Sequence, residues 1–555
     1  MPVKRPKFIF VIGGVMSSVG KGIAASSIGA ILQSRGYRVT NVKCDMYVNI
    51  DAGTIRPTEH GEVFVGNDGI EADQDLGNYE RFTGNTMSSL NYITTGQVYQ
   101  EVIRRERNLE YAGEDVEVVP DVPNEIIRRI LLAQSKVNAE ITVIEFGGTV
   151  GEYQVLLFLE AARVMKVNHP DDIAFVLVSY LPLPRHVGEM KTKPTQYAVR
   201  TLNAAGIMAD FIIARGEQEL DDRRREILAK VCNLQAGTVI AAPDQESIYD
   251  VPVEFHQQKF DEQLLTSLNL KPKKNNLRSW LNFSAKVKNC SNVVKIGVVG
   301  KYFGTGDFTL ADSYISVIEA AKHAAWEHDA RPQLTWIDAE VYEENPRRVR
   351  ELSAYDGIIV PGGFGSRGVD GVLTAIKYIR EKKIPYLGLC YGMQLATIEF
   401  ARNVAHIRNG HTVEIDESTP DPIICVNPSQ SQNIKTKNMG ATMRLGSYPC
   451  TLARESIAYR AYKKDTIKER HRHRYEFNNQ YRAALEKAGM RFSGINEPDN
   501  LVEIIELTDH PFFVGTQFHP EFLSRPMQPH PLFSAFVQAC LSQPKKSGRK
   551  AQHGT

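Results

Sequence analysis

Two series of short, continuous apolar runs divide this chain, and each run suits one buried β-strand. The first series comprises residues 8–12 (FIFVI), 39–42 (VTNV), 141–146 (ITVIEF), 173–180 (IAFVLVSY) and 210–214 (DFIIA). Strands that are apolar on both faces and alternate with helical stretches are typical of a parallel sheet covered by helices on both sides. The first half of the chain is therefore expected to form an open α/β domain.

The second series begins near the middle of the chain. It comprises residues 293–300 (VVKIGVVG), 355–363 (YDGIIVPGG), 384–390 (IPYLGLC) and 512–518 (FFVGTQF), and predicts a second open, mostly parallel α/β sheet. Residues 268–292 between the two series are polar, basic and rich in asparagine, which indicates a linker. We therefore predict domains at 1–267 and 293–541, and a disordered basic tail at 542–555.

Composition excludes several classes of protein. The 555 residues carry a formal net charge of +1, so nothing favours nucleic acid or a membrane surface as a partner. No apolar run approaches the roughly 20 residues of a membrane span, and we expect a cytoplasmic protein. The seven cysteines, spread singly from Cys44 to Cys540, form neither a disulfide framework nor paired metal knuckles. Most of them are expected to be small buried hydrophobic residues.

A glycine-rich loop with a lysine follows the first strand. Gly13, Gly14, Gly20 and Gly22 allow a tight turn whose amides, with the following helix N-terminus, can face phosphate oxygens, and Lys21 adds a positive charge. The spacing departs from a P-loop, because five residues separate Gly14 from Gly20 and a glycine replaces the metal-binding serine or threonine. The loop could be merely structural, but the order strand, loop, lysine and helix favours nucleotide binding.

Three further charged residues are candidates for the same site. Lys43 follows the second strand at its carboxyl end, where open α/β sheets bind ligands, although alone it could be a solvated loop residue. Glu145 ends an apolar strand, and a carboxylate there is costly without a partner. Asp75 could equally be a loop or cap residue. Two carboxylates beside a triphosphate suffice for Mg²⁺.

The stretch KTKPTQ at 191–196 is a second candidate for binding phosphate. It brings Lys191, Lys193, Thr195 and Gln196 onto one turn-like segment. An exposed basic loop is an equally good interpretation of these residues.

The second series carries the residues of a cysteine nucleophile. Cys390 lies between a strand and a helix, with Gly388 and Gly392 on either side, which is the spacing of a nucleophile elbow. A helix N-terminus there favours the reactive thiolate. His519 and Glu521 are two apart on an extended segment, so the carboxylate can orient an imidazole that shuttles protons. The amides of the PGGFG loop at 361–365 suit an oxyanion hole.

At these residues the chain resembles the CTP synthase family, in which a synthetase domain is joined to a class I glutamine amidotransferase domain. The resemblance covers about residues 6–540 and rests on nine motifs in order: GGVMSSVGKGI, DAGT with HGEVFV, DQDLGNYERF, GGTVG, KTKPTQ, PGGFG, GLCYGMQ, RHRHRYE and QFHPEF. It implies a P-loop-like synthetase domain and a flavodoxin-like glutaminase domain. It also implies that ATP drives the amination of UTP to CTP, with ammonia released from glutamine.

The resemblance implies roles in the synthetase domain. Lys21 and Lys43 would stabilise the phosphoryl group as ATP phosphorylates O4 of uracil, and Mg²⁺ would bind Asp75 and Glu145. The implied ATP-binding positions are Ser18, Val19, Gly20, Lys21, Gly22, Ile23 and Asp75, and the implied positions for UTP or CTP are Ser17, Glu152, Tyr153, Gln154, Lys191, Thr192, Lys193, Pro194, Thr195 and Gln196.

In the glutaminase domain, Cys390 would attack the glutamine amide, His519 would protonate the departing ammonia and Glu521 would orient His519. The family also implies a tunnel for ammonia, activation by GTP, inhibition by CTP and a homotetramer. The implied glutamine-binding positions are Gly363 and Tyr391, whose amides would hold the oxyanion, with Gly392, Met393, Gln394, Glu414 and Arg474.

The chain departs from the family pattern at four places. Glu152, Tyr153 and Gln154 replace an acidic stretch that helps to bind the pyrimidine of the product, which bears on inhibition by CTP. Residues 302–314 are longer than usual, which bears on the coupling of GTP to glutamine hydrolysis. Arg56, Pro57 and Thr58 replace Ser-Pro-Tyr, and Tyr391 stands where leucine or valine is common. Neither of these last two changes removes a catalytic group.

Two other functions remain as alternatives. An ATP-dependent amidotransferase with a different acceptor would share the second domain but would not need KTKPTQ together with DQDLGNYERF. A noncatalytic nucleotide sensor or filament protein would be expected to have lost its nucleophile or base, whereas Cys390, His519 and Glu521 are all present.

Overall fold

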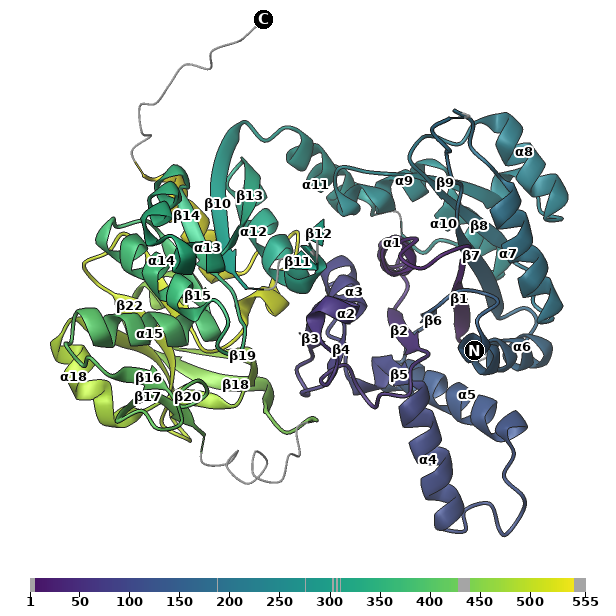
Figure 1. Cartoon of the computed structure of the whole chain (residues 1–555). Helices are drawn as coiled ribbons and strands as arrows, with labels where there is room; N and C mark the ends of the chain where they lie inside the picture. Colours follow the sequence, from purple (N-terminus) through teal and green to yellow (C-terminus); the bar gives the residue numbers. More distant parts are fainter. Residues whose placement is uncertain are drawn as a thin grey trace, which may run out of the picture. The chain divides into compact units, whose positions relative to one another are not determined.

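The chain forms two compact units (Figure 1). The computed structural model describes residues 5–543, except 187, 275, 302, 303, 306, 307, 310 and 428–439. The first unit consists of Met1–Ile55 and Gly66–Lys288, and the second of Arg56–Val65 and Asn289–Thr555. Residues 544–555 of the predicted tail and much of the unusual 302–314 stretch lie outside the described residues.

A seven-stranded sheet, entirely parallel, is the centre of the first unit. All five predicted strands are confirmed, and β5 and β9 add an unpredicted strand at each edge. The strand order is β5-β2-β6-β1-β7-β8-β9. The strands are β1 (Lys7–Gly14), β2 (Val39–Asp45), β5 (Tyr92–Thr94), β6 (Ile141–Phe146), β7 (Ile173–Tyr180), β8 (Phe211–Gly216) and β9 (Val239–Pro243).

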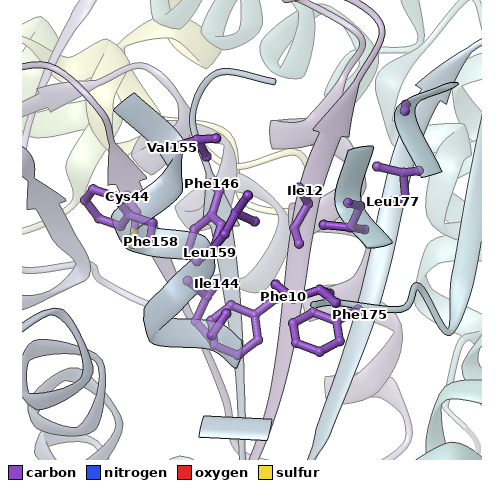
Figure 2. Packing of buried hydrophobic residues seen from close by; sticks show 14 of the residues in the cluster. Phe10, Ile12, Cys44, Ile144, Phe146, Val155, Phe158, Leu159, Phe175 and Leu177 are labelled. Carbon is purple, nitrogen blue, oxygen red and sulfur yellow. The ribbon is translucent and has the colours of Figure 1, made fainter. Parts of the chain in front are cut away.

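Helices cover both faces of this sheet, as the apolar strands require. On one face, Phe10 of β1 packs against Phe146 at 5.4 Å and Phe175 at 5.6 Å between ring centroids, and Phe158 of α6 packs against Phe146 at 5.8 Å (Figure 2). Helix α1 contacts β1, β2 and β6 but contributes nothing to that cluster, so it covers the opposite face.

The other helices and the short strand β4 of the first unit lie between these strands in the chain or, for α9 to α11, follow β9. They are α1 (Lys21–Ser34), β4 (Glu71–Asp73), α3 (Asp75–Thr83), α4 (Thr95–Arg107), α5 (Val118–Lys136), α6 (Leu156–Asn168), α7 (Lys193–Ala204), α8 (Asp222–Val231), α9 (Val251–Gln257), α10 (Phe260–Ser267) and α11 (Arg278–Lys288). Helix α11 lies within the predicted linker, and its Trp280 stacks on Tyr249 with centroids 6.3 Å apart. Part of the linker is therefore packed against the first unit.

A nine-stranded sheet is the centre of the second unit, in the order β13-β10-β14-β15-β23-β22-β21-β18-β19. The first five strands are parallel, and the last four continue the sheet in antiparallel pairs. The four predicted strands are β10 (Asn292–Gly300), β14 (Gly357–Val360), β15 (Tyr386–Leu389) and β23 (Phe513–Thr516). The others are β13 (Ala330–Asp338), β18 (Arg444–Leu452), β19 (Thr466–His473), β21 (Met490–Asn496) and β22 (Leu501–Leu507).

Shorter strands and helices complete the second unit. They are α2 (Pro57–His60), β3 (Val63–Val65), β11 (Gly304–Thr305), β12 (Phe308–Thr309), α12 (Ile315–Glu327), α13 (Glu340–Glu344), α14 (Val369–Glu381), α15 (Tyr391–Asn403), β16 (Gly410–Thr412), β17 (Asp421–Val426), α17 (Ile457–Tyr462), β20 (Tyr475–Phe477), α18 (Arg482–Lys487) and α19 (Pro531–Leu541). Across the described ranges, no helix combines the length and apolar character needed to span a membrane.

Segment Arg56–Val65 belongs to the second unit although the predicted boundaries include it in the first domain. Its Phe64 packs edge-on against Phe522 with centroids 5.1 Å apart, and Glu62 accepts a hydrogen bond from the amide of Ser316 at 3.1 Å. Buried apolar and charged contacts hold the segment there, and the order of residues along the chain does not reveal such long-range contacts.

Candidate active sites

The glycine-rich loop connects β1 to α1 in the first unit. Gly20, directly before α1, has a φ of 84°, a left-handed conformation that suits glycine. Lys21 begins the helix and is buried. Burial, together with the nearby charge of Lys43, lowers the pKa of Lys21, and Glu145 and Asp75 oppose this shift. A buried ammonium next to a helix N-terminus is well placed to bind a phosphate.

Lys43 connects the predicted carboxylates. Its Nζ donates to Glu145 Oε1 at 3.0 Å and also to Asp75 Oδ2. Asp45 and Asp73 lie 3.8 and 3.9 Å from the same nitrogen. Burial disfavours the charge, but the four carboxylates raise the pKa of Lys43 well above its usual value. The structure therefore brings Lys43, Asp75 and Glu145 together, and adds Asp45 and Asp73, which the sequence analysis did not identify.

The approach of Asp75 explains why the loop lacks the serine or threonine of a P-loop. A Cβ atom on Gly22 would lie 1.8 Å from Asp75 Oδ1. Asp75 is the first residue of α3, and Asn78 Nδ2 donates to its Oδ1 at 3.2 Å, so the carboxylate is held in place. The carboxylate therefore occupies the space that a side chain at position 22 would take.

Asp75 and Glu145 can share one cation, since each already contacts the same ammonium nitrogen. Burial and the charge of Asp75 raise the pKa of Glu145 to about 7, against the opposing effect of Lys43 and Lys21. Within the described residues, no three His, Cys, Asp or Glu side chains form a group that could hold a metal unaided. A divalent cation with two carboxylates would need further oxygen ligands, which a nucleotide triphosphate supplies.

The implied pyrimidine-nucleotide positions lie on three segments at the carboxyl edge of the same sheet: Ser17 after β1, residues 152–154 after β6 and residues 191–196 after β7. The hydroxyl of Thr195 on α7 lies 2.8 Å from that of Ser179 on β7, and this contact ties the helix to the end of the strand. Glu152 accepts hydrogen bonds from the amide and hydroxyl of Thr149 at 2.9 and 2.6 Å. Tyr153 is 90% exposed. The carboxylate of Glu152 is thus already hydrogen-bonded, and the ring of Tyr153 is exposed. This segment therefore offers a ligand different contacts from those of an acidic stretch whose carboxylates are free to bind it.

The two lysines of the KTKPTQ stretch face outward. Lys191 Nζ pairs with Glu189 at 2.9 Å, and Lys193 is exposed. The pairing of Lys191 with Glu189 does not connect these lysines to Lys43 and its carboxylate partners. Their distance from a phosphate therefore depends on where the ligand binds.

Beside the glycine-rich loop lies a pocket that the sequence analysis missed. It is lined by Gly20, Ile23, Ile213, Arg215, Asp244 and Ile248, among others. The Arg215 guanidinium donates to Asp244 Oδ1 at 2.7 Å. Apolar walls with a few polar groups suit a flat heterocycle. Ile213 and Arg215 are two apart on one strand, so their side chains lie on the same face of the sheet. This spacing could have indicated the pocket from the sequence.

Cys390 occupies a strained turn in the second unit. It lies between β15 and α15 with φ 49° and ψ −97°, outside the regions that a cysteine usually adopts. Its amide donates to the carbonyl of Thr516 at 2.6 Å, and Gln517 Nε2 approaches Sγ at 3.5 Å. The predicted nucleophile elbow is therefore the geometry found, and Gln517 is an additional partner of the sulfur.

His519 and Glu521 form a buried pair, since His519 Nδ1 lies 2.7 Å from Glu521 Oε1. Burial opposes the imidazolium, but the charge of Glu521 and that of a Cys390 thiolate raise the pKa of His519 to about 10. In the part of the chain that the structure describes, Nε2 of His519 has no hydrogen-bond partner. That nitrogen is available to a reacting group, and both residues line one cavity with Cys390, Gly362 and Gly363.

Of the implied glutamine-binding residues, Gly363 lines this cavity directly, whereas Gln394, Glu414 and Arg474 contact other residues of the second unit. Gln394 Nε2 donates to Gln517 Oε1 at 3.1 Å, and Gln517 is the residue whose Nε2 approaches Cys390 Sγ. Glu414 Oε1 accepts from the amide of Gly365 at 2.7 Å, and burial raises the pKa of Glu414. The buried Arg474 donates from Nη1 to Thr442 at 2.9 Å. An anion and a cation are thus available for the two ends of an amino acid.

Segment Arg56–Val65 contributes to the same cavity. Pro57, Glu62 and Val63 line it opposite the cysteine. Sequence reasoning missed these residues and Gln517, although Gln517 precedes His519 by two positions and therefore shares its side of an extended segment.

Comparison with known proteins agrees with this geometry. Residues 7–270 match the family described as CTP synthase N-terminus, and residues 309–539 match the family described as glutamine amidotransferase class-I. Proteins named CTP synthase from Halalkalibacterium halodurans and Caldanaerobacter subterraneus are 46% and 47% identical, covering 96% and 97% of this chain and 99% and 98% of theirs. The glutaminase domain of Trypanosoma brucei CTPS with bound acivicin is 35% identical over 45% of this chain and 94% of that chain, with a TM-score of 0.41.

Proposed function

The chain belongs to the CTP synthase family, and from this membership we propose how its residues convert UTP, ATP and glutamine into CTP. The chain is a glutamine-hydrolysing ligase that aminates UTP to CTP. One observation supports the assignment of residues most strongly: each unit contains a complete set of reactive groups. These are Lys21, Lys43, Asp75 and Glu145 in the first unit, and Cys390, His519 and Glu521 in the second.

In the first unit, ATP transfers its terminal phosphoryl group to O4 of uracil, and ammonia then displaces phosphate at C4. Lys21 and Lys43 neutralise charge on the transferred phosphoryl group, because both are cations at the helix N-terminus and strand end. The adenine fits the pocket beside Gly20 and Arg215. ATP contacts Ser18, Val19, Gly20, Lys21, Gly22, Ile23 and Asp75, and the pyrimidine nucleotide contacts Ser17, Glu152, Tyr153, Gln154 and residues 191–196.

Asp75 and Glu145 would hold Mg²⁺, which supplies positive charge to the phosphate oxygens of ATP. Two observations support this assignment. Both carboxylates contact the same cationic nitrogen, and both offer the oxygen ligands that Mg²⁺ prefers. Lys43 remains close enough to counter the negative charge that both carboxylates and the nucleotide bring together.

Removing the divalent cation is expected to stop CTP formation from both glutamine and ammonium. Excess EDTA should reduce both rates to background, and MgCl₂ in excess of the chelator should restore them. Release of glutamate from glutamine alone, measured in parallel, should persist because Cys390 and His519 lie outside the cluster of Asp75 and Glu145. CTP formation that survives EDTA would contradict the metal assignment.

In the second unit, Cys390 Sγ attacks the amide carbon of glutamine. The amides of Gly363 and Tyr391 stabilise the resulting oxyanion. Nε2 of His519 gives its proton to the amide nitrogen, so that ammonia leaves and a thioester remains. His519 then accepts a proton from the water that hydrolyses the thioester. Gly392, Met393 and Gln394 shape the site, and Glu414 and Arg474 bind the α-ammonium and α-carboxylate of glutamine.

Replacing Glu521 by glutamine is expected to move the alkaline limb of glutamine hydrolysis to lower pH. The carboxylate stabilises the imidazolium, so its removal lowers the pKa of His519 from about 10. Glutamate release by the wild-type protein should hold up to about pH 9. In the variant it should decline at least about one pH unit earlier, because one unit corresponds to about 1.4 kcal/mol of charge interaction. Identical limbs in both proteins would contradict a role for Glu521 in charging His519.

For regulation, assembly and location, we propose that this chain has the properties that the family resemblance implies. GTP activates glutamine hydrolysis, CTP inhibits, the chain assembles as a homotetramer, and it acts in the cytoplasm. Glu152 is already bonded to Thr149, so inhibition by CTP is expected to be weaker than in relatives with an open acidic stretch.

The function is tested by incubating purified protein with ATP, MgCl₂ and glutamine or ammonium, and separating the nucleotides by chromatography. CTP should form with UTP as the acceptor, in amounts that match the ADP released. The same protein offered other carbonyl or carboxylate acceptors should release ADP only at background. Glutamate release without CTP, together with product from another acceptor, would support a different amidotransferase.

A further inference from the structure

A set of contacts at the oxyanion loop, residues 361–365, includes side-chain atoms to which the assignments above give no role. Lys301 follows β10, and its Nζ donates to the carbonyl oxygens of Phe364 at 3.1 Å and Gly365 at 2.6 Å. The hydroxyl of Tyr391 donates to the same Gly365 oxygen at 2.9 Å. The amide of Gly365 donates to Glu414 at 2.7 Å. Gly365 is therefore held at its carbonyl by two side chains and at its amide by a third.

Lys301 and Tyr391 also contact each other. Lys301 Nζ lies 4.5 Å from the centroid of the Tyr391 ring, within the range of a cation–π interaction. Both line a small cavity behind the loop together with Gly362 and Gly363. Lys301 is only 6% exposed, and burial lowers its pKa to about 8 against the opposing charges of Glu414 and Glu343. A buried ammonium whose closest partners include two neutral carbonyls is costly to maintain, which indicates a specific role.

We propose that Lys301 and the side chain of Tyr391 are positioning residues, which fix the oxyanion loop against the nucleophile helix during glutamine hydrolysis. The two oxyanion amides come from separate elements, Gly363 from the loop after β14 and Tyr391 from the start of α15. The Tyr391 hydroxyl joins these two elements directly, because it donates to the carbonyl of Gly365 in the loop. The inference rests on the proposed roles of Cys390 and Gly363.

The test uses two variants that preserve shape and the backbone amide. Tyr391→Phe removes only the hydroxyl, and Lys301→Met removes the ammonium group with its charge and its two hydrogen bonds. Each should lower kcat for glutamate release about tenfold, less than the 10²- to 10³-fold that follows loss of an oxyanion donor. KM for glutamine should stay within about threefold, since Glu414 and Arg474 are unchanged. The double variant should lose less than the product of the single losses, because both side chains hold one carbonyl.

A second measurement separates positioning of the loop from general damage. Alkylation of Cys390 by iodoacetamide needs the nucleophile but forms no oxyanion. Its rate should therefore remain within about twofold of wild type in both variants while hydrolysis falls. Tyr378→Phe and Lys382→Met are matched controls, since Lys382 lies over the Tyr378 ring at 6.0 Å, away from the loop. Both controls should behave as wild type, and CTP formation from ammonium should show that the first unit is intact.

Three results would overturn the inference. They are an unchanged kcat in both variants, a loss confined to KM, and an alkylation rate that falls in parallel with kcat. Persistence of glutamate release in Cys390→Ala would instead refute the proposed function of the site, so the two failures can be told apart.

Discussion

Cys390→Ala should lose CTP formation from glutamine by about 10⁴-fold or more while keeping CTP formation from ammonium. The sulfur is the proposed nucleophile for the glutamine amide, and alanine cannot form the thioester. Gln517 and the pair of His519 and Glu521 would remain in place, but without a nucleophile they cannot release ammonia at a useful rate. Ammonium bypasses this step, because it supplies the nitrogen directly to the first unit.

The measurement compares initial rates of CTP formation with glutamine and with ammonium at one pH, together with glutamate release. Cys425→Ala is the matched control. Cys425 is half-buried on β17, and the residues lining the cysteine cavity do not include it. The control should retain both activities. Equal loss of both activities in Cys390→Ala would mean that the substitution damages the protein, and retention of the glutamine reaction would mean that Cys390 is not the nucleophile.

The predicted site residues that the structure brings together depend on local geometry. Cys390 and Glu145 each end a buried strand, so their positions at the edge of a sheet follow from the run of apolar residues before them. His519 and Glu521 are close in sequence and therefore close in space. The predicted strands of both series are likewise continuous apolar runs, which need no knowledge of their neighbours.

Other features depend on contacts between distant residues. Strand β18 is half-exposed along much of its length, so its pattern of apolar residues is weak, and its pairing with β19 and β21 had no local signal. The four carboxylates around Lys43 come from β2, β4, β6 and the start of α3. The docking of Phe64 on Phe522 joins positions hundreds of residues apart. Only the folded chain reveals such groups.

The family pattern and the structure explain each other at Gly22. A P-loop would have serine or threonine there, whereas this chain has glycine. The carboxylate of Asp75 lies where that side chain would be, so it takes the place of the hydroxyl side chain in the same space. This exchange makes position 22 unusually intolerant of any side chain.

Gly22→Ala is accordingly expected to reduce CTP formation from both nitrogen sources by about 100-fold, because small displacements of catalytic groups cost that much. The added Cβ would lie 1.8 Å from Asp75 Oδ1, so Asp75 must move away from Lys43 and Asn78. Glutamate release should change little. Gly237→Ala is the matched control, since its Cβ would come no closer than 3.8 Å to Gln263, and it should retain full activity.

A double variant distinguishes the clash from a simple loss of stability. Crowding a packed site costs about 1–3 kcal/mol, so Gly22→Ala alone should unfold at lower denaturant concentration than wild type. In Asp75→Ala the obstructing carboxylate is gone, and adding Gly22→Ala to it should cost little further stability. CTP formation should stay low in the double variant, because the carboxylate that is proposed to bind Mg²⁺ is missing. If Gly22→Ala destabilises equally with and without Asp75, the close approach of the carboxylate is not the reason for glycine at this position.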